Sequence, residues 1–482
     1  MVLWHQIALT GRRLGRMADR LTALDASFLY LEQPTTPMHL GGVAVLRRPK
    51  SGFDHQRLIE LIEQRLALVP RYRQKVKNVP AHLARPVWVD DPDFDIGYHV
   101  RRSALPKPGS DAQLHELVGR LMSRQLDRQR PLWEVYLVEG LAKNRIAIIT
   151  KTHHAMVDGV RAMDIGQIML DITPTPRNAP EDLWLPRPEP GGLQLMVDAA
   201  GEAVQRPGEV VDNVRTAAMD AASTVRRVGI AVGGLFDALR TAMRAAPGSP
   251  LNVPISTQRR FAVARTALED YKLVRAAHGG TVNDVVLAVV SGALRNWLLS
   301  RGEPVTGSTA IRAMAPVTVR GGPDAGAQPA GGTVSAYLVD LPVGEPNAVV
   351  RLHHVSHAMR GHQDSGQSVG ADVLVRLGGF APPTMHALGA RVANGFSQRI
   401  YNLVVTNVPG PQVPLYAAGA RLLEMFAVVP LSKNQGLSIG VTSYDGGVYF
   451  GLNADRDALT DVDGLASMIE ESLEELTGTV PR

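Results

Sequence analysis

The chain has 482 residues, more than the roughly 250–300 at which a single hydrophobic core stops growing, so at least two domains are expected. Hydrophobic residues make up 45% and charged residues 20%, a globular composition that excludes a disordered or fibrous protein. Lys and Arg outnumber Asp and Glu by only 51 to 46, and no basic tract is interleaved with aromatic residues, so no nucleic-acid partner is expected. The absence of cysteine excludes disulfides, thiolate nucleophiles and Cys-type zinc sites, and it favours a cytosolic compartment.

The N-terminus begins with a short apolar stretch followed by arginines, the reverse of the order in a secretory signal. We therefore predict that residues 1–16 are a tail or the result of an upstream start site, with the first domain starting at Met17. No uninterrupted apolar run reaches the roughly 18–20 residues that span a bilayer, which predicts a soluble or peripheral protein.

Residues 17–173 alternate between helical and strand-like patterns, as expected for one mixed α/β domain. The segment FDHQRLIELIEQRLALVP predicts an amphipathic helix, and WEVYLVEGLAKNRIAIITKT predicts two strands around a turn. A proline cluster between residues 174 and 190 sustains neither helix nor central strand, so it predicts an interdomain linker.

Residues 174–250 combine this linker with two or three predicted crossover helices. Within them, residues 225–246 form a basic amphipathic pattern that suits an anionic membrane surface, although a helix packed across two domains is the commoner origin of such a pattern.

Residues 251–482 form the predicted second domain. Thr281 and Asp284 match a capping box at the start of a long apolar helix, whose N-terminus would let Asn283 hold a loop or a substrate oxygen. NLVVTNV, LSIGVTSY and GVYFGLNAD predict strands, with Asp445 and Gly446 as a hairpin turn.

The segment KTHHAMVDGV carries the strongest local signal for chemistry. It places His153 and His154 where an apolar strand gives way to a helical pattern, and only one of two adjacent side chains enters a cleft easily, so the other is expected to brace the loop. A neutral imidazole is suited to take a proton from an alcohol or amine. Asp158 would orient that ring or bind a distant Arg, and Gly159 would permit a tight turn.

The structural alternative is that Asp158 caps the next helix and that both histidines are ordinary residues at a strand end. A metal site is disfavoured, because the adjacent pair lacks the i, i+4 spacing of helical zinc ligands. A second pair, His353 and His354, lies in a helical pattern without the Asp-Gly and is assigned to surface or interdomain packing.

Ser438 lies in a G-x-S-x-G match that would need a helix after the serine. A hairpin pattern follows instead, so we interpret the match as accidental. Two rigid local sequences complete the set of motifs, Pro131-Leu132-Trp133 at a strand start and Asn407-Val408-Pro409-Gly410-Pro411 at a strand end.

These pieces, in this order, resemble the bacterial wax ester synthase/acyl-CoA:diacylglycerol acyltransferase family, whose wider relatives include chloramphenicol acetyltransferases and nonribosomal condensation domains. The resemblance spans nearly the whole chain and rests on LTALDASFLYLEQPTTPMHLGG, RPLWEVYLVEGL, HHAMVDG, GGTVNDVVLAVVSGALRNWL and TNVPGP. It implies two chloramphenicol-acetyltransferase-like α/β domains joined by a helical crossover, with the active site in a tunnel between them.

By this resemblance His154 is the general base, which deprotonates a lipid hydroxyl for attack on an acyl-CoA thioester without an acyl-enzyme, a cofactor or a metal. Asp158 is then mainly structural and Gly159 supports the turn. The remaining motif residues also take family roles: Asn283 and Asp284 match the ND pair near the active site, Pro131, Leu132 and Trp133 match the PLW motif of the acyl-chain region, and Asn407 begins the NVPGP motif. Gly332 departs from the family, where a polar Asn is expected.

The leading hypothesis is therefore an enzyme that esterifies diacylglycerol with a fatty acyl-CoA to form triacylglycerol. A long-chain fatty alcohol as acceptor, a condensation-type reaction with another hydroxyl or amine, an esterase using Ser438 and a non-catalytic lipid-binding protein remain as alternatives. The substrates imply a cytoplasmic protein attached peripherally to the inner leaflet of the cell membrane or to lipid droplets.

Overall fold

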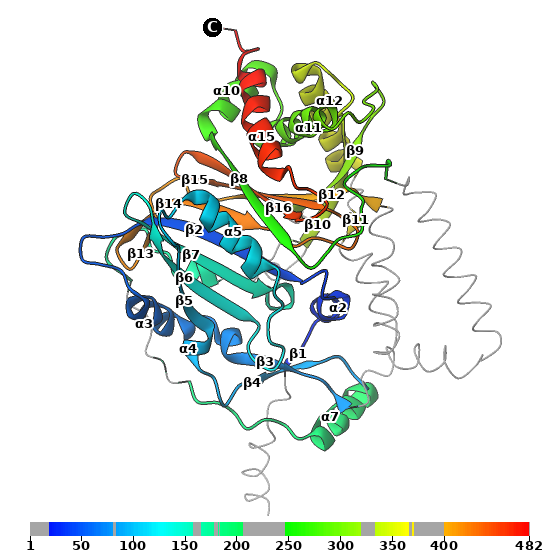
Figure 1. Ribbon diagram of the computed structural model, residues 1–482. Helices are drawn as coiled ribbons and strands as arrows, with labels where there is room; N and C mark the ends of the chain where they lie inside the picture. Colours follow the sequence, from blue (N-terminus) through cyan, green and yellow to red (C-terminus); the bar gives the residue numbers. More distant parts are fainter. Residues whose placement is uncertain are drawn as a thin grey trace, which may run out of the picture.

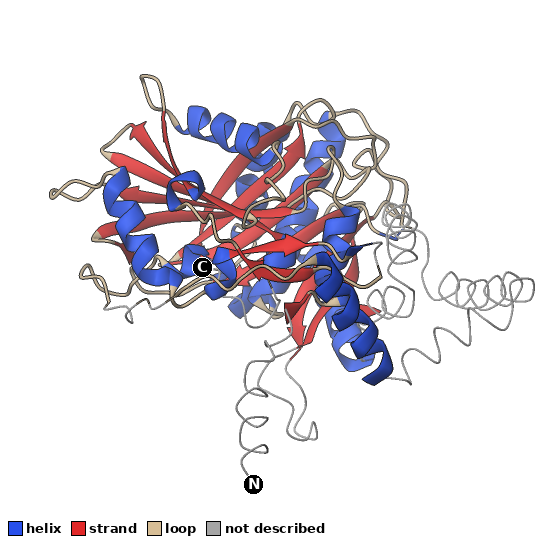
Figure 2. Cartoon of the chain, turned by 90° about the horizontal axis from the view of Figure 1, so that it is seen from below, coloured by secondary structure: helices blue, strands red, loops and turns tan. Residues whose placement is uncertain are grey.

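The computed structural model describes residues 19–80, 83–157, 165–177, 182, 184–205, 246–319, 333–365, 369–370 and 400–481. Strands cross the middle of the molecule and most helices lie around them (Figures 1 and 2). The described strands form three sheets: a six-stranded one, called the N-terminal sheet, a seven-stranded one, called the C-terminal sheet, and a small one of three strands. This mixed architecture agrees with the predicted α/β class.

The N-terminal sheet has the strand order β13-β14-β2-β7-β6-β5. Its strands are β2 (His39–Arg47), β5 (Val100–Ala104), β6 (Trp133–Leu141), β7 (Arg145–His153), β13 (Tyr416–Ala417) and β14 (Ala420–Val428). The central strand β7 is buried along almost its whole length, as its apolar sequence requires. The predicted hairpin is confirmed, because β6 and β7 pair antiparallel around Lys143 and Asn144, which both adopt positive φ.

Five described helices accompany this sheet, and a side chain caps the N-terminus of each of the first four. They are α2 (Ala23–Leu31), α3 (His55–Leu66), α4 (Ile96–His99), α5 (Asp111–Met122) and α6 (Ile165–Ile168), with a 3₁₀ turn at Pro70–Arg73. Helix α3 confirms the predicted amphipathic helix, since Asp54 caps it and its Leu58, Leu61 and Ile62 are buried.

The small sheet has the order β1-β4-β3 and consists of β1 (Asp19–Arg20), β3 (Gln74–Lys77) and β4 (Val87–Asp90). The described part of the proline-rich segment has no regular structure, as predicted, and it lies along this sheet through ion pairs such as Arg187 with Asp90. Helix α7 (Gly192–Gln205) follows and buries Leu195 against the same sheet. The predicted amphipathic stretch 225–246 lies outside the described residues, apart from Ala246.

The C-terminal sheet has the order β11-β10-β9-β12-β15-β16-β8. Its strands are β8 (Arg259–Ala267), β9 (Ile311–Val319), β10 (Thr333–Leu341), β11 (Val369–Gly370), β12 (Leu403–Pro409), β15 (Leu437–Tyr444) and β16 (Gly447–Asp455). Strand β12 runs parallel to β9 and β15, and the other pairs are antiparallel. The Asp445-Gly446 turn between β15 and β16 is confirmed, with φ of 43° and 82°.

Helices α10 (Leu268–His278), α11 (Val282–Ser300), α12 (Ala348–Ser365) and α15 (Val462–Thr477) pack together beside this sheet (Figure 1). The capping box that begins α11 is present in full: the backbone N–H of Asp284 donates to Thr281 Oγ1 at 3.1 Å, and that of Thr281 donates to Asp284 Oδ2 at 2.9 Å. Among the described helices α11 alone is long and apolar enough to cross a membrane, but 72% of that stretch is buried against neighbouring elements, which identifies it as the core helix of this half.

The two large sheets are not each built from one stretch of chain. Strands β13 and β14 follow β12 of the C-terminal sheet, yet β14 pairs antiparallel with β2 and extends the N-terminal sheet. The domain boundaries expected at residues 174 and 251 stay predictions. From sequence alone, residues 416–428 are assigned to the second domain, and no local pattern indicates that β14 is exchanged into the sheet of the first.

Two glycines of the C-terminal sheet allow strand β14 to approach it closely. Gly440 and Gly451 lie opposite each other on β15 and β16. A Cβ at Gly440 would lie 2.9 Å from the Ala427 carbonyl oxygen of β14, and one at Gly451 would collide with the same oxygen. The contact between the two sheets therefore depends on the absence of side chains here.

We expect Gly451→Ala to lower the free energy of unfolding by about 1–3 kcal/mol, because β14 must move to admit the methyl group. Urea denaturation measures the change. Gly464→Ala in α15 is the control: nothing lies within 4 Å of its Cβ position, so its stability should equal or exceed that of the parent. Equal stabilities for both variants would contradict the close approach.

Candidate active site

The HH motif lies where the sequence predicted, at the end of the central strand of the N-terminal sheet. β7 ends at His153, and His154–Met156 form a 3₁₀ turn. The backbone N–H of His153 donates to the carbonyl of Leu132 at 2.9 Å, and that of His154 donates to the carbonyl of Met38 at 2.8 Å. These two bonds fix the motif to the chain on both of its sides.

His154 lies against helix α2. Its ring stacks on Phe28, with ring centroids 3.9 Å apart and planes inclined by 22°. Its Nδ1 is buried and has no hydrogen-bond partner in the described part of the chain, while the residue as a whole keeps some exposed surface. Burial lowers the pKa of His154 to about 4, so the imidazole is neutral at physiological pH and able to accept a proton.

His153 has a different environment and is almost completely buried. Its Nδ1 accepts a hydrogen bond from the backbone N–H of Ala155 at 3.0 Å, which leaves the proton on Nε2, 3.8 Å from the Glu32 carboxylate. Arg128 in turn holds Glu32 at 2.6 Å. Burial, together with the nearby Arg128 charge, lowers the pKa of His153 to about 3. The His153 ring is thus bound to the turn and lies near Glu32, whereas the His154 ring lies against Phe28; the catalytic roles of the two histidines stay predictions.

The PLW motif directly supports the HH motif. The Leu132 carbonyl accepts the backbone hydrogen bond from His153. Trp133 begins β6 and is fully buried, and its Nε1 donates to the Tyr72 carbonyl at 2.7 Å. The Trp133 ring stacks on His99 with centroids 4.5 Å apart. The structure therefore shows a packing and backbone role for Leu132 and Trp133, and the acyl-chain role that the family resemblance gives to Pro131, Leu132 and Trp133 stays a prediction.

A second cluster joins two motifs that are 124 residues apart in the chain. Asn407, near the end of β12, donates from Nδ2 to Oδ1 of Asn283 at 3.0 Å, at the N-terminal turn of α11. Both side chains are partly exposed, whereas Asp284 is buried in the capping box. No contact is recorded between these amides and the HH motif within the described residues, so their functional roles stay predictions.

The structure also shows where the other residues singled out in the sequence lie. Ser438 is the second residue of β15 (Leu437–Tyr444), is buried, and donates from Oγ to the Val429 carbonyl at 2.7 Å, so it does not stand on a strand-to-helix turn. His353 and His354 lie exposed on α12, as the surface assignment predicted. Asp158, Gly159 and Gly332 lie outside the described residues.

The structure also adds residues that sequence reasoning did not assign. Phe28 and Glu32 belong to the segment LTALDASFLYLEQPTTPMHLGG, which carried the family resemblance without a role for either residue. Beside His153 on β7, Lys151 is buried within 3.7 Å of Glu134, and burial lowers its pKa to about 8 although Glu134 opposes the shift. In the described part of the chain, no group of three or more His, Asp or Glu side chains is placed to hold a metal.

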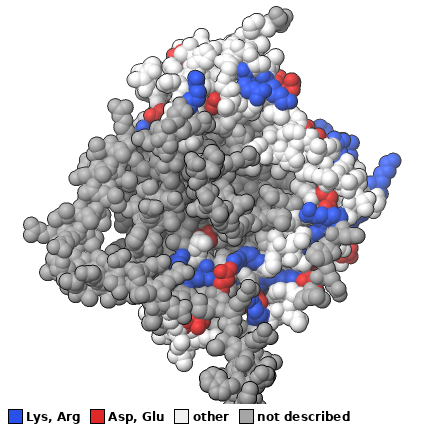
Figure 3. Space-filling view, turned by 180° about the vertical axis from the view of Figure 1, so that it is seen from behind, with Lys and Arg blue, Asp and Glu red and all other residues white. Residues whose placement is uncertain are grey.

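Charge on the described surface is mixed. On the face shown in Figure 3, blue and red atoms are interleaved. Ion pairs such as Lys77 with Glu189 and Arg71 with Asp19 show the same alternation in detail.

Comparison with known proteins identifies the family. The model of the wax ester synthase/diacylglycerol acyltransferase catalytic domain matches residues 21–286, and that of the WS/DGAT C-terminal domain matches residues 330–477. The chain belongs to the WS/DGAT family. A probable diacylglycerol O-acyltransferase of Mycobacterium tuberculosis, tgs1, is 34% identical to this WS/DGAT protein over 472 residues, 96% of this chain and 97% of the relative. A second from the same species, tgs3, is 51% identical over 263 residues, 54% of this chain and 97% of the relative.

Solved structures agree with this family. The wax ester synthase/diacylglycerol acyltransferase of Marinobacter aquaeolei VT8 matches with a TM-score of 0.65 and 28% identity, covering 96% of this chain and 99% of that one. The first condensation domain of the calcium-dependent antibiotic synthetase matches with a TM-score of 0.55 at 18% identity, covering 96% of each chain, and supports the fold alone. The predicted fold class, two chloramphenicol-acetyltransferase-like domains, is thereby confirmed.

Proposed function

We propose that this protein transfers a long-chain fatty acyl group from acyl-CoA to the free hydroxyl of diacylglycerol, forming triacylglycerol and CoA. Membership of the WS/DGAT family and the names of the mycobacterial relatives support the reaction. The observation that carries it is His154, a neutral, largely desolvated imidazole at the end of the central strand, with a buried Nδ1 that no described group engages.

The acceptor hydroxyl donates its hydrogen bond to the imidazole of His154 in this mechanism. As the proton moves to the ring, the hydroxyl oxygen attacks the thioester carbonyl carbon and forms a tetrahedral oxyanion. The C–S bond then breaks, and the departing CoA thiolate takes the proton from the imidazolium. General-base catalysis of this kind contributes about 10²–10⁴ in rate.

The surroundings of His154 act on both halves of this cycle. The low pKa keeps the ring neutral before the hydroxyl arrives and favours return of the proton to the CoA thiolate, while the face of Phe28 offers a favourable contact for the imidazolium that forms between these two steps. His153, fixed by Ala155 and close to Glu32, holds the turn that presents its neighbour. His153 is thus a positioning residue.

In this mechanism the acyl group passes directly from CoA to the acceptor hydroxyl, without an acyl-enzyme. The chain has no cysteine, and the Ser438 hydroxyl is already bound to the Val429 carbonyl inside a sheet. The thioester supplies the driving force, so the reaction needs acyl-CoA as co-substrate and no cofactor.

Peripheral attachment to the inner leaflet of the cell membrane or to lipid droplets, from the cytoplasm, is part of the proposal. Diacylglycerol is insoluble in water, and α7 presents apolar side chains to solvent. Leu193 is 77% exposed and Val197 62% exposed on one face of this helix, and Leu185 just before it is 82% exposed. Exposed apolar residues at i, i+4 spacing support contact with lipid.

Release of CoA from palmitoyl-CoA by the purified protein tests the reaction. We expect release to require diacylglycerol and to fall at least about 100-fold in His154→Ala, because the base is lost. The exposed His354→Ala is the matched control and should retain full activity. Hexadecanol as the preferred acceptor would instead indicate a wax ester synthase, and acceptor-independent release that survives in His154→Ala but not in Ser438→Ala would indicate an esterase.

Flotation with liposomes that contain anionic lipid tests the attachment. The parent protein should float with the vesicles, and Leu193→Ser combined with Val197→Ser should shift it towards the aqueous fraction, since both apolar side chains are lost from the surface. A parent protein that stays in the aqueous fraction would refute attachment.

A further inference from the structure

Lys151 is a buried cation that the proposed mechanism does not use. It lies two residues before His153 on β7, so the two side chains share one face of the N-terminal sheet. Its side chain is only 1% exposed, and its pKa, lowered by burial to about 8, still leaves the ammonium form in excess at pH 7. Holding a charge away from water costs free energy of folding, and buried titratable groups of this kind gather at functional sites.

Charged and titratable groups from several elements face this ammonium. They include Glu134 of β6, Arg101 of β5, Glu32 at the end of α2, Arg124 and, on β2, His39. The carboxylate of Glu134 lies 3.7 Å from Nζ, but it also pairs with Arg101 at 3.1 Å and accepts a hydrogen bond from the Tyr136 hydroxyl at 2.7 Å. Glu134 therefore keeps partners of its own if Lys151 is removed.

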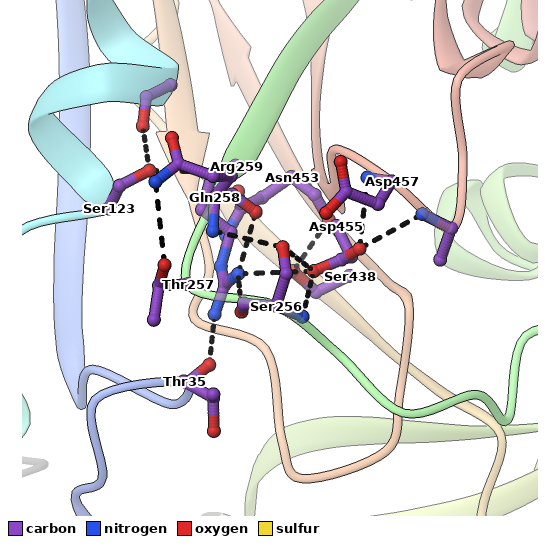
Figure 4. A network of polar contacts seen from close by, with 12 residues as sticks. Thr35, Ser123, Ser256, Thr257, Gln258, Arg259, Ser438, Asn453, Asp455 and Asp457 are labelled. Atoms are coloured by element: carbon purple, nitrogen blue, oxygen red, sulfur yellow. Dashed lines mark hydrogen bonds and ion pairs between the residues drawn. The ribbon is translucent and has the colours of Figure 1, made fainter.

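Lys151 also reaches the connection between helix α5 and strand β6. This segment, the α5–β6 loop, comprises residues 123–132 and leads into the PLW motif. The Nζ of Lys151 donates a hydrogen bond to the carbonyl of Arg124 in the loop. The start of the loop meets the C-terminal half as well, because the backbone N–H of Arg259 donates to Ser123 Oγ at 3.0 Å (Figure 4). Lys151 thus joins this loop to the strand that ends in the HH motif.

The same loop holds helix α2. Arg128 donates from Nη2 to the Leu29 carbonyl at 2.8 Å and to the Glu32 carboxylate at 2.6 Å. Both acceptors lie within about one turn of Phe28, whose ring stacks on His154. A chain of contacts therefore runs from Lys151 through the loop and α2 to the ring of His154.

We propose that Lys151 is a positioning residue of the acyl transfer. Its ammonium fixes the α5–β6 loop to β7, and Arg128 of that loop keeps α2, with Phe28, against the ring of His154. The inference rests on the proposed function, since it takes His154 as the base. A base that is covered in this way stays desolvated and oriented, and a misplacement of about 1 Å can cost roughly 100-fold in rate.

A purely structural role explains Lys151 less well. An unbranched apolar side chain would occupy the same space without the cost of desolvating a charge, and such replacements of buried ion pairs often leave a protein as stable or more stable. Removing one member of a pair is destabilising when the other charge stays behind uncompensated, but Glu134 keeps Arg101.

Lys151→Met separates positioning from stability. The midpoint of urea denaturation should equal or exceed that of the parent. In contrast, kcat for transfer from palmitoyl-CoA to diacylglycerol should fall roughly 10–100-fold, with both KM values within about twofold of the parent. Lys151→Arg keeps a cationic donor and should recover part of the lost kcat.

The pKa of His154 supplies a readout that a structural role would not move. Burial, and not a neighbouring charge, lowers this pKa to about 4, so loss of the Lys151 charge alone should leave it there. If α2 loosens, water reaches the ring, and the pKa should rise by at least about one unit towards that of a solvated histidine. Histidine NMR of the full-length protein measures this pKa without substrate, with His154→Ala to assign the resonance.

Lys77→Met is the matched control. Lys77 likewise donates to a backbone carbonyl, that of Pro190 at 2.8 Å, and pairs with the Glu189 carboxylate, but it lies on β3 of the small sheet. This variant should leave the pKa of His154 unchanged. Arg128→Met should raise that pKa as Lys151→Met does, and the double variant should raise it little further, because both residues act through one loop.

Several results would overturn the proposal. An unchanged His154 pKa in Lys151→Met would break the link to α2, and an equal rise in Lys77→Met, or fully additive shifts in the double variant, would exclude the loop as the route. A fall in the urea midpoint that accounts for the lost activity would leave Lys151 with a structural role alone. If instead the parent transfers no acyl group while Lys151→Met still raises the His154 pKa, the proposed function fails and the chain of contacts stands.

Discussion

The structure depends most on the way the end of β7 is held between its neighbours. The backbone N–H groups of His153 and His154 donate to carbonyls of Leu132 and Met38, on opposite sides of the central strand. These bonds determine which ring is bound into the interior and which lies against Phe28. The low pKa values, the neutral imidazole and the proposed proton transfer all follow from that placement, because burial in an apolar setting disfavours the charged ring.

A second constraint is the close packing that joins the N-terminal sheet to the C-terminal sheet. Strand β14 extends the N-terminal sheet although it comes from the C-terminal half, and the absence of side chains at Gly440 and Gly451 lets it approach the other sheet closely. The ion pair of Arg265 with Glu424 adds a further link between β8 and β14. Val43 of β2 and Phe261 of β8 belong to one buried apolar cluster, so the two sheets pack together although their strands come from distant parts of the sequence.

Local features of the structure were predictable from sequence and long-range ones were not. The β6–β7 hairpin, the Asp445-Gly446 turn and the Thr281–Asp284 capping box each depend on residues close together in the chain, so periodicity and turn chemistry suffice. The exchange of β14 and the hydrogen bond from Asn407 to Asn283 depend on pairings over more than 100 residues, which no local pattern encodes. Phe28 and Glu32 were missed for the same reason, since only the folded chain brings α2 to the HH turn. The positions of Asp158 and Gly159 stay predictions, because they lie outside the described residues.

The central claim is that a buried, neutral His154 accepts the proton of the acceptor hydroxyl. The most direct measurement is kcat/KM for acyl transfer as a function of pH, with circular dichroism confirming that the protein stays folded at each point. Since the base must be neutral and its pKa is lowered to about 4, activity should persist as the pH falls through 6 and decline only as it approaches 4. An acid limb centred near 6.5, the value of a solvated histidine, would contradict the account.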